Sequence, residues 1–168
     1  ILHPWESGRD NSVDWDAALD RVPVEGVEPF TRRDTLHANP AHRPTQSQYE
    51  RYIWLVQCFR DLGWDNTKLH AVSPFKMEAR WADAAGQYLC HDRAIGALVD
   101  SPSVGGLIAA FAPVPPDRAS AIAARIATLG EAVNYLIPSH DPTVPEFDAL
   151  RYWRGPAWLI VNYLIADG

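Results

Sequence analysis

The sequence predicts an all-α fold, with helices joined by long loops and at most a small β-hairpin. Apolar residues recur every three or four positions over 45–62 and over 115–129, which is the spacing of an amphipathic helix. Between the predicted helices, 24–44 and 138–150 are long and rich in proline, as irregular connections are. With 168 residues, 47% hydrophobic and 21% charged, the chain is long enough for one domain with a sizeable core.

The first half of the chain predicts three helices. A short helix is expected over 14–21, because a proline follows shortly after it. The clearest helix covers 45–62, with Thr45 as its N-cap and Gly63 behind its last turn. Another short helix is expected over 66–72, before a Ser-Pro pair that stops it.

The second half predicts one small hairpin and further helical segments. The hairpin pairs 87–92 with 97–100 around a short turn. The helical segments are one or two turns in 78–84, a buried helix over 103–111, an amphipathic helix over 115–129 with Gly130 at its C-terminal end, and a final helix that begins at Gly155-Pro156 with proline in its first turn.

Charge and hydropathy exclude two classes of partner. The net charge is -6 at pH 7, so the chain lacks the basic excess that a phosphate backbone requires, and we expect no nucleic acid partner. The longest apolar run, 157–165, is interrupted by Asn162 and is far shorter than the roughly 20 residues that span a bilayer. We therefore expect no contact with a membrane.

The cysteines and histidines show no metal-binding spacing. Cys58 and Cys90 are widely separated and are expected to be buried free thiols, which is typical of a reducing compartment and indicates a cytoplasmic protein. The six histidines lack His-x-x-x-His or mixed Cys/His spacing. The sequence therefore predicts no metal and no cofactor.

The N-terminal segment carries the most informative pattern. It reads His3-Pro4-Trp5-Glu6-Ser7-Gly8-Arg9-Asp10-Asn11-Ser12 and continues to Asp16, with two tryptophans and four carboxylates in all. An indole face packs on the apolar face of a pyranose, and a carboxyl group beside it is partly desolvated, which favours its proton-donating form. The alternative is structural, with Trp5 and Trp15 as core residues and Asp14 as the N-cap of the following helix.

A second aromatic cluster near the other end favours the sugar-binding interpretation. It reads Tyr152-Trp153-Arg154-Gly155-Pro156-Ala157-Trp158. Together the two segments resemble the glycoside hydrolases of the mannosylglycerate and glucosylglycerate hydrolase group, relatives of the processing α-glucosidases, in which both strings face one sugar pocket. Two multi-residue strings in the right order are a specific signal. The resemblance implies an (α/α)6 barrel whose loops at one end form the pocket.

The resemblance also implies a reaction, the inverting hydrolysis of a small anionic α-glycoside such as glucosylglycerate or mannosylglycerate. This chemistry needs one carboxyl group that protonates the leaving oxygen and another that activates a water molecule. By resemblance, Asp10 has the general-acid position, Arg43 and Tyr49 lie near the carboxylate of a glycerate aglycone, and the sugar subsite is lined by Trp5, Tyr152, Trp153 and Trp158.

Without the resemblance, several of these residues have structural interpretations. Trp158 would be a core residue, Arg43 a solvated loop residue and Tyr49 part of a helix core. Glu6 either raises the pKa of the general acid from nearby or holds a loop by accepting N–H bonds. Arg154 is interpreted as structural, stacked on a tryptophan or paired with a loop carboxylate.

Two departures from the family pattern indicate a portion of a catalytic domain. The general base, a Glu expected downstream of the second string, is missing, because no Glu follows Glu146. In addition, Pro74-Phe75-Lys76-Met77 runs directly into Glu78-Ala79-Arg80-Trp81, where the family has a further helix pair. We therefore expect 1–168 to be part of the barrel, lacking an N-terminal portion, an internal helix pair and a C-terminal portion, with its apolar faces covered by other chains or by the missing remainder.

Three other functions stay open at this point. A related α-glucosidase or trehalase-like hydrolase would act on neutral oligosaccharides, and a catalytically silent remnant would keep the sugar pocket without a base. An interaction scaffold would carry its tryptophan clusters by coincidence. In all but the last, the partner is a small carbohydrate.

Overall fold

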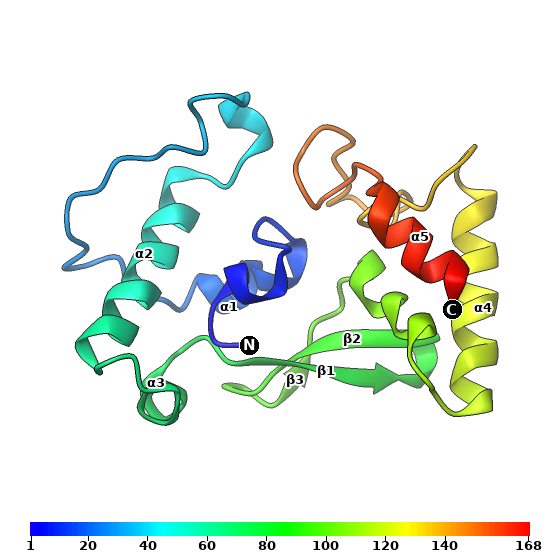
Figure 1. The fold of residues 1–168 in the computed structure, drawn as a ribbon, viewed down its shortest axis with the longest axis horizontal. Helices are drawn as coiled ribbons and strands as arrows, with labels where there is room; N and C mark the ends of the chain where they lie inside the picture. Colours follow the sequence, from blue (N-terminus) through cyan, green and yellow to red (C-terminus); the bar gives the residue numbers. More distant parts are fainter.

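The structure, a computed structural model, describes residues 1–168 and combines helices with one three-stranded sheet (Figure 1). The α-helices are α1 (Asp16–Leu19), α2 (Gln46–Asp61), α3 (Asn66–Val72), α4 (Pro116–Glu131) and α5 (Leu159–Asp167). The strands are β1 (Met77–Ala82), β2 (Gln87–Asp92) and β3 (Ala97–Leu98). The short 3₁₀ helices are η1 (Pro4–Ser7), η2 (Val13–Trp15), η3 (Pro40–His42), η4 (Asp83–Ala85), η5 (Val104–Gly106) and η6 (Ile108–Phe111).

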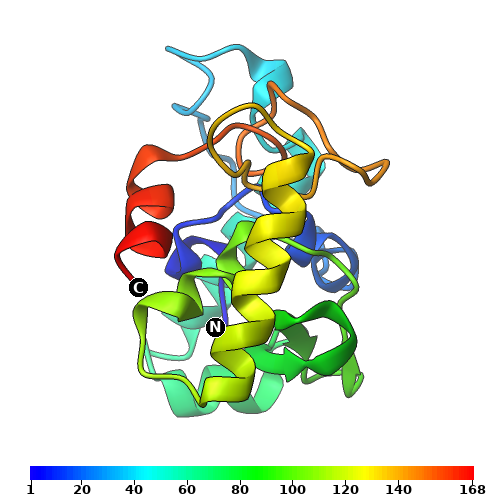
Figure 2. The ribbon, with the colours of Figure 1, turned by 90° about the vertical axis from the view of Figure 1, so that its right-hand side faces the viewer.

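The sheet connects two groups of helices. In Figure 1, α2 and α3 lie at one end of the molecule and α4 and α5 at the other, with the N-terminal turns between them. Strands β1 and β2 pair antiparallel, from Met77 opposite Asp92 to Ala82 opposite Gln87, and β3 pairs antiparallel with β2. Figure 2, which looks onto the α4 end, shows α4 in front of the sheet and α5 to one side.

The buried apolar residues form two cores, one at each end. The first core joins α1, α2 and β1, and it consists of Trp15, Ala18, Leu19, Val22, Tyr52, Leu55, Phe75, Met77 and Cys90. The second joins η5, α4 and α5, and it consists of Val104, Leu107, Ile122, Leu129, Ile137, Val161 and Ile165. Burial of apolar surface is the main favourable term in folding, so each core stabilises the fold of its own end of the molecule.

Helix α2 begins and ends where the sequence predicts. Oγ1 of Thr45 accepts the N–H of Gln48 (3.2 Å), and Oε1 of Gln48 accepts the N–H of Thr45 (2.9 Å), which is a reciprocal capping box. Gly63, with φ of +72°, follows the last turn in the left-handed region that favours glycine. The helix buries Tyr52 and Leu55 against the first core.

The expectation of an all-α fold is wrong at 78–82, which forms strand β1 instead of the helical turns expected over 78–84; only 83–84 belong to a helical turn, η4. The side chains of β1 meet partners across the strand pair. Trp81 contacts Tyr88 edge to face, with ring centroids 5.3 Å apart, and Oε1 of Glu78 lies 3.1 Å from Nδ1 of His91. Pairing with β2, the next strand along the chain, thus decides the conformation of 78–82 against its local helical preference.

The predicted hairpin and several predicted helices are confirmed. Strand β2 pairs with β3, although β3 is shorter than the expected 97–100. The helix over 66–72 is α3, and the one over 14–21 is η2 continued by α1. The helix over 115–129 is α4, which continues through Glu131.

The predicted helix over 103–111 is replaced by the two short turns η5 and η6. Gly106 lies directly against the carbonyl oxygen of Tyr88 in β2, so that even a Cβ atom would clash there. The segment follows the strand this closely because glycine has no side chain, and a regular helix would not keep the contact.

The final helix begins at Leu159, later than predicted. Gly155 lies directly against the carbonyl oxygen of Asp148, and the carbonyl oxygen of Pro156 accepts the N–H of Ser139 (3.2 Å). These two contacts tie the preceding residues to other loops, so Pro156 does not lie in the first turn of α5.

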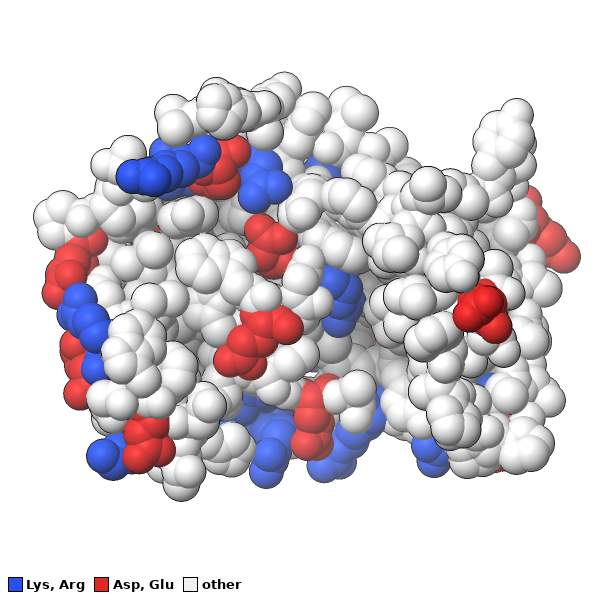
Figure 3. All heavy atoms as spheres, in the orientation of Figure 1, with Lys and Arg blue, Asp and Glu red and all other residues white.

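The outer face of α5 is apolar and exposed. Leu159, Ile160 and Tyr163 are 75%, 64% and 60% exposed. Figure 3 shows the surface over α5 as mostly uncharged. Such a stripe on a helix normally packs against another element. None of the helices combines the length and the hydropathy that crossing a membrane would require.

Both cysteines are free thiols, as predicted. Cys90 is buried in the first core, whereas Cys58 is only half-buried. Burial and the nearby Asp14 carboxylate raise the pKa of Cys90 to about 12. Its thiol is therefore protonated and unreactive at neutral pH.

Candidate active site

The turn η1 brings Asp10 between the two ends of the molecule. His3 caps this turn, because its Nδ1 accepts the N–H of Trp5 (3.1 Å). Gly8 ends the turn with φ of +68°, a conformation that a side chain would strain. Asp10 follows this turn, two residues after Gly8.

Side chains from three separate segments hold the backbone around Asp10. Each of three consecutive carbonyl oxygens accepts one hydrogen bond from a side chain: that of Arg9 from Nε1 of Trp15 (2.6 Å), that of Asp10 from the hydroxyl of Tyr52, and that of Asn11 from Nε of Arg154 (3.0 Å). All three donor residues are buried. The position of Asp10 is thus fixed by tertiary contacts rather than by a helix or strand.

The carboxyl group of Asp10 meets residues of two distant segments. Its side chain is 16% exposed, and Oδ2 lies 3.5 Å from Nη2 of Arg43. Cζ of Arg43 lies 4.4 Å from the ring centroid of Tyr152. Burial raises the pKa of Asp10, Arg43 and a backbone hydrogen bond lower it, and the Asp34 carboxylate raises it again. The net result is a raised pKa, which favours the proton-donating form.

Asp10, Arg43, Asp34 and Arg32 form a charged cluster, and the sequence analysis missed Asp34. Its two oxygens accept hydrogen bonds from Nε (3.0 Å) and Nη2 (2.6 Å) of Arg32, and its Oδ2 also lies 3.5 Å from Nε of Arg43. The hydrogen bonds from Arg32 are the main cause that lowers the pKa of Asp34, so it stays ionised. In sequence, Asp34 is one charged residue in a long irregular loop, and no motif distinguishes it.

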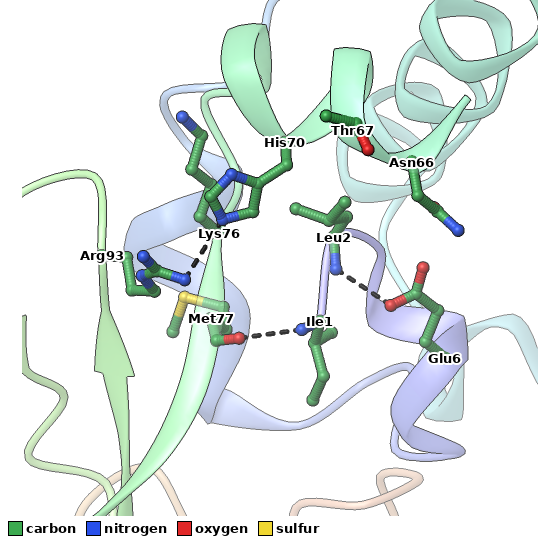
Figure 4. A pocket seen from close by; sticks show the side chains of 9 residues that line it. All are labelled: Ile1, Leu2, Glu6, Asn66, Thr67, His70, Lys76, Met77 and Arg93. Atoms are coloured by element: carbon green, nitrogen blue, oxygen red, sulfur yellow. Dashed lines mark hydrogen bonds between the residues drawn. The ribbon is translucent and has the colours of Figure 1, made fainter. Parts of the chain in front are cut away.

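Glu6 does not lie beside Asp10 as one interpretation proposed. Its Oε2 accepts the N–H of Leu2 (2.9 Å), so Glu6 holds the N-terminal turn, as the other interpretation expected. Figure 4 shows Glu6 at the rim of a separate cavity of about 670 Å³, lined also by His70, Lys76 and Arg93. Asp10 is not among its lining residues. The anion that raises the pKa of Asp10 is Asp34.

The N-terminal aromatic residues form one group of contacting rings. Trp5 is 41% exposed and meets Tyr49 and Tyr52 edge to face, at centroid distances of 5.9 and 5.7 Å. Tyr49 stacks on Phe30 (5.5 Å), and Cζ of Arg32 lies 4.6 Å from the Tyr49 ring centroid. Trp5 is therefore not a core residue, and Tyr49 sits between the first core and the charged cluster.

The C-terminal aromatic residues form a second group. Tyr152 meets Trp158 edge to face (4.9 Å), and Trp153 stacks on Trp158 (5.0 Å). Trp153 and Trp158 also pack against the second core, as the structural interpretation of Trp158 expected. Trp153 has φ of +61°, which is rare and costly for a bulky side chain and recurs at functional sites.

Arg43 connects the two groups. It pairs with Asp10 from the N-terminal turn and lies over Tyr152 from the C-terminal loop, while the N–H of Tyr152 donates to the carbonyl oxygen of His42 (3.0 Å). Arg43 is only 20% exposed, so it is not a solvated loop residue. The aromatic rings of the two groups do not touch one another directly.

Arg154 has the structural role that the sequence analysis expected. Its Nη1 and Nη2 donate to the two oxygens of Asp16 (2.8 and 2.6 Å), and its Nε donates to the carbonyl oxygen of Asn11. This fork joins the second sequence string to the first.

Two further residues of the N-terminal segment are structural. Trp15 is fully buried in the first core. Asp14 is not a helix cap: Ser12 caps η2, and Asp14 pairs with Arg9 and accepts a hydrogen bond from Ser103 (2.9 Å). No group of three or more histidine, cysteine, aspartate or glutamate side chains converges as metal ligands would.

The chain matches known proteins along its whole length. The model of the mannosylglycerate hydrolase MGH1-like glycoside hydrolase domain matches residues 1–79 and 75–168. The chain belongs to this family. Similar members are the mannosylglycerate hydrolase of Thermus thermophilus, 37% identical over 100% of this chain and 51% of that protein, and mannosylglycerate hydrolase MGH1 of Selaginella moellendorffii, 34% identical over 99% and 43%.

Solved structures of the family share the fold. The crystal structure of a Thermus thermophilus mannosylglycerate hydrolase in complex with Tris and D-glycerate is 35% identical and superposes with a TM-score of 0.93, over 99% of this chain and 51% of that one. The complex of that enzyme with glucose has a TM-score of 0.91. The chain thus spans about half the length of the family members that it matches.

The family match is split where the sequence departs from the family pattern. Its two segments meet at residues 75–79, at the start of β1. The alignment with the Thermus thermophilus relative covers 210 positions, more than the 168 residues of this chain. Relatives therefore have residues within the aligned region that this chain lacks.

Proposed function

We propose that the protein is an inverting glycosidase whose substrate is a glycoside of glycerate, either glucosylglycerate or mannosylglycerate. In this proposal, the chain supplies the general acid and the aromatic sugar subsite. One observation carries the proposal. The half-buried carboxyl group of Asp10 has a raised pKa and lies against Arg43, which covers the ring of Tyr152. The names of the matched relatives support the same substrate class.

Asp10 would act as the general acid. It gives its proton to the glycosidic oxygen as the bond from that oxygen to the anomeric carbon breaks, and the glycerate leaves as a neutral alcohol at that oxygen. Water attacks the anomeric carbon from the opposite face and loses a proton to a second carboxylate, the general base. Asp34 is unsuited to that role, because Arg32 occupies both its oxygens and its pKa is lowered.

The general base would lie outside these 168 residues, within the part of the family members that the chain does not span. We propose that 1–168 is a portion of an (α/α)6 barrel. The exposed apolar face of α5, formed by Leu159, Ile160 and Tyr163, supports this, because it needs an apolar neighbour.

The sugar would pack against rings from both aromatic groups. The indole of Trp5 is exposed enough to offer a face to a pyranose, and Tyr152, Trp153 and Trp158 would form the opposite wall. The backbone strain at Trp153 supports a functional placement of its indole over a purely structural one.

The charge of the cluster favours an anionic aglycone. When Asp10 carries the proton that catalysis needs, the cluster retains the cations of Arg32 and Arg43 and the single anion of Asp34, a net excess of one positive charge. A carboxylate matches the planar fork of a guanidinium, so Arg43 would bind the glycerate carboxylate with Tyr49 beside it. A neutral oligosaccharide would leave the excess cation unpaired.

The test is hydrolysis by the complete protein of glucosylglycerate, mannosylglycerate and neutral α-disaccharides, with the anomeric configuration of the first product followed by NMR. We expect turnover of a glycerate glycoside with inversion, and loss of turnover with retained substrate binding in Asp10→Asn. The matched control is Asp100→Asn, at an exposed position. Turnover by Asp10→Asn would refute the assignment of the acid.

The same screen tests the two alternatives. Preference for neutral disaccharides, with little effect of Arg43→Ala on KM, would indicate the α-glucosidase or trehalase-like function. Saturable quenching of tryptophan fluorescence by sugars without turnover of any glycoside would indicate a sugar-binding protein.

A further inference from the structure

Arg43 lies between the carboxylates of Asp10 and Asp34, and this placement indicates how Asp10 acquires its proton. Its Nη2 lies 3.5 Å from Oδ2 of Asp10, and its Nε lies 3.5 Å from Oδ2 of Asp34. Neither contact is a close hydrogen bond, whereas Asp34 is held closely by Arg32 (2.6 Å). The guanidinium of Arg43 is therefore stacked on Tyr152 with two long ion pairs and no tight one.

Arg32 holds the Asp34 carboxylate in place. It donates to both oxygens of Asp34 and to the carbonyl oxygen of Pro44 (2.9 Å), and it lies over the ring of Tyr49. Asp34 consequently keeps its place and its charge. The pair that can exchange is that of Arg43 with Asp10.

We propose that Arg43 is a switch operated by the substrate: it pairs with Asp10 in the free site, and the carboxylate of an anionic aglycone takes this guanidinium from Asp10, which then takes up a proton. This inference rests on the proposed function. It adds that binding of the substrate's carboxylate makes Asp10 take up the proton that it later donates to the glycosidic oxygen. The acid is thereby selective for anionic glycosides at the chemical step as well as in binding.

The charged groups around Asp10 support this sequence of events. Arg43 is the one neighbouring cation that stabilises the Asp10 carboxylate, and Asp34 is the anion that opposes it. The phenols of Tyr49 and Tyr52 face the cluster from α2 and are neutral, because burial raises the pKa of both. Once a ligand carboxylate neutralises Arg43, burial and Asp34 remain, and both favour protonated Asp10.

The proton balance is simple. The proton that Asp10 takes up comes from solvent when the ligand binds. It passes to the glycosidic oxygen when the bond to the anomeric carbon breaks. In the free site at neutral pH, the pair with Arg43 keeps a larger share of Asp10 ionised.

The first experiment compares a charged and a neutral substrate with the complete protein. Mannosylglycerate is paired with mannosylglycerol, which replaces the carboxylate by a hydroxymethyl group. The basic limb of kcat/KM reports the acid of the free enzyme, and that of kcat reports the acid of the substrate complex. For mannosylglycerate we expect the limb of kcat to lie about one pH unit above that of kcat/KM, the lower end of what an arginine beside a carboxylate produces. For mannosylglycerol the two limbs should coincide.

The second experiment needs no turnover. Calorimetric titration with D-glycerate in two buffers of different ionisation enthalpy measures protons taken up on binding, with glycerol as the neutral control. We expect net uptake with D-glycerate between about pH 4 and 7, the range above the ordinary pKa of an aspartate, and none with glycerol. The uptake should disappear in Asp10→Asn.

A variant of Asp34 tests the opposing anion. Asp34→Asn keeps the side-chain shape and should move the basic limb of kcat/KM to lower pH, because the charge that favours protonated Asp10 is removed. Arg33→Gln, at an exposed position of the same loop, is the control and should leave the limb unchanged. A limb that does not move in Asp34→Asn contradicts the electrostatic part of the inference.

The outcomes separate the inference from the proposed function. Turnover of the glycerate glycoside with coincident limbs and no proton uptake overturns the switch and leaves the glycosidase in place. Absence of both turnover and D-glycerate binding overturns the two together.

Discussion

Removing the hydroxyl group of Tyr52 should loosen Asp10 without changing any group that touches substrate. Tyr52 is fully buried in α2, and its hydroxyl donates to the carbonyl oxygen of Asp10. Tyr52→Phe keeps the ring, which contacts Trp5 and His3, and creates almost no cavity. The variant therefore isolates a single hydrogen bond.

The magnitude follows from what remains unsatisfied. Leaving a buried acceptor without its donor lowers the free energy of unfolding by about 1–3 kcal/mol. The carbonyl group of Asp10 has no other side-chain partner to replace the hydroxyl of Tyr52. Because Asp10 is only partly buried, water can replace part of the loss, and we expect the free energy of unfolding to fall by about 1–2 kcal/mol. A displaced acid should also lower kcat by about tenfold, which corresponds to about 1.4 kcal/mol in the activation free energy.

The assays are urea unfolding and steady-state hydrolysis of the glycerate glycoside. Tyr135→Phe removes the same hydroxyl group from a side chain that is 93% exposed, and it should change the free energy of unfolding by less than about 0.5 kcal/mol. If Tyr52→Phe behaves like this control in both assays, the carbonyl bond does not position Asp10, and the account of the three anchored carbonyl groups is wrong.

Two further predictions concern stability. Arg154→Met should lower the free energy of unfolding by about 2–3 kcal/mol, because it leaves Asp16 and the carbonyl group of Asn11 without their donor. A double-mutant cycle with Asp16→Asn should give a coupling energy of about 1–2 kcal/mol. Additive single effects would contradict the paired hydrogen bonds between Arg154 and Asp16. Asp10 and Asp14 should respond to pH with opposite signs in urea unfolding. Burial raises the folded-state pKa of Asp10, so its contribution is present below the unfolded pKa and is lost as the pH rises through the folded pKa, and Asp10→Asn should stabilise the protein near pH 7 but not near pH 3. Burial alone would raise the pKa of Asp14, but Arg9, Ser101 and Ser103 outweigh it and lower the pKa, so the stability that Asp14 contributes should be lost as the pH falls below about 4, and Asp14→Asn should remove that loss.

Elements with strong local signals were predictable from the sequence. The capping box at Thr45, the apolar spacing behind it and Gly63 define α2 within a few neighbouring residues, and the structure agrees. Strand β1 was not predictable in this way, because its conformation depends on pairing with β2 beyond a turn. The start of α5 was misjudged for a related reason, since Gly155 contacts a loop that precedes it in the chain.

The candidate site divides along the same line. The two sequence strings identify Asp10, Tyr152 and the tryptophans as residue types suited to sugar chemistry, and the family match supports that resemblance. The sequence could not decide whether Glu6 or another anion acts on Asp10. The structure assigns that effect to Asp34. Arg32 and Arg43 both pair with Asp34, and Arg43 also pairs with Asp10.

The sequence by itself determined the chemical inventory of this protein: a capped helix, two aromatic strings and a carboxyl group in a motif of glycoside hydrolases. Only the tertiary structure decided which charges meet, and with them the protonation of Asp10 and the central place of Arg43. The physical reason is that helix formation is governed by neighbours along the chain, whereas pKa values and ion pairs depend on distances in space and on exclusion of water.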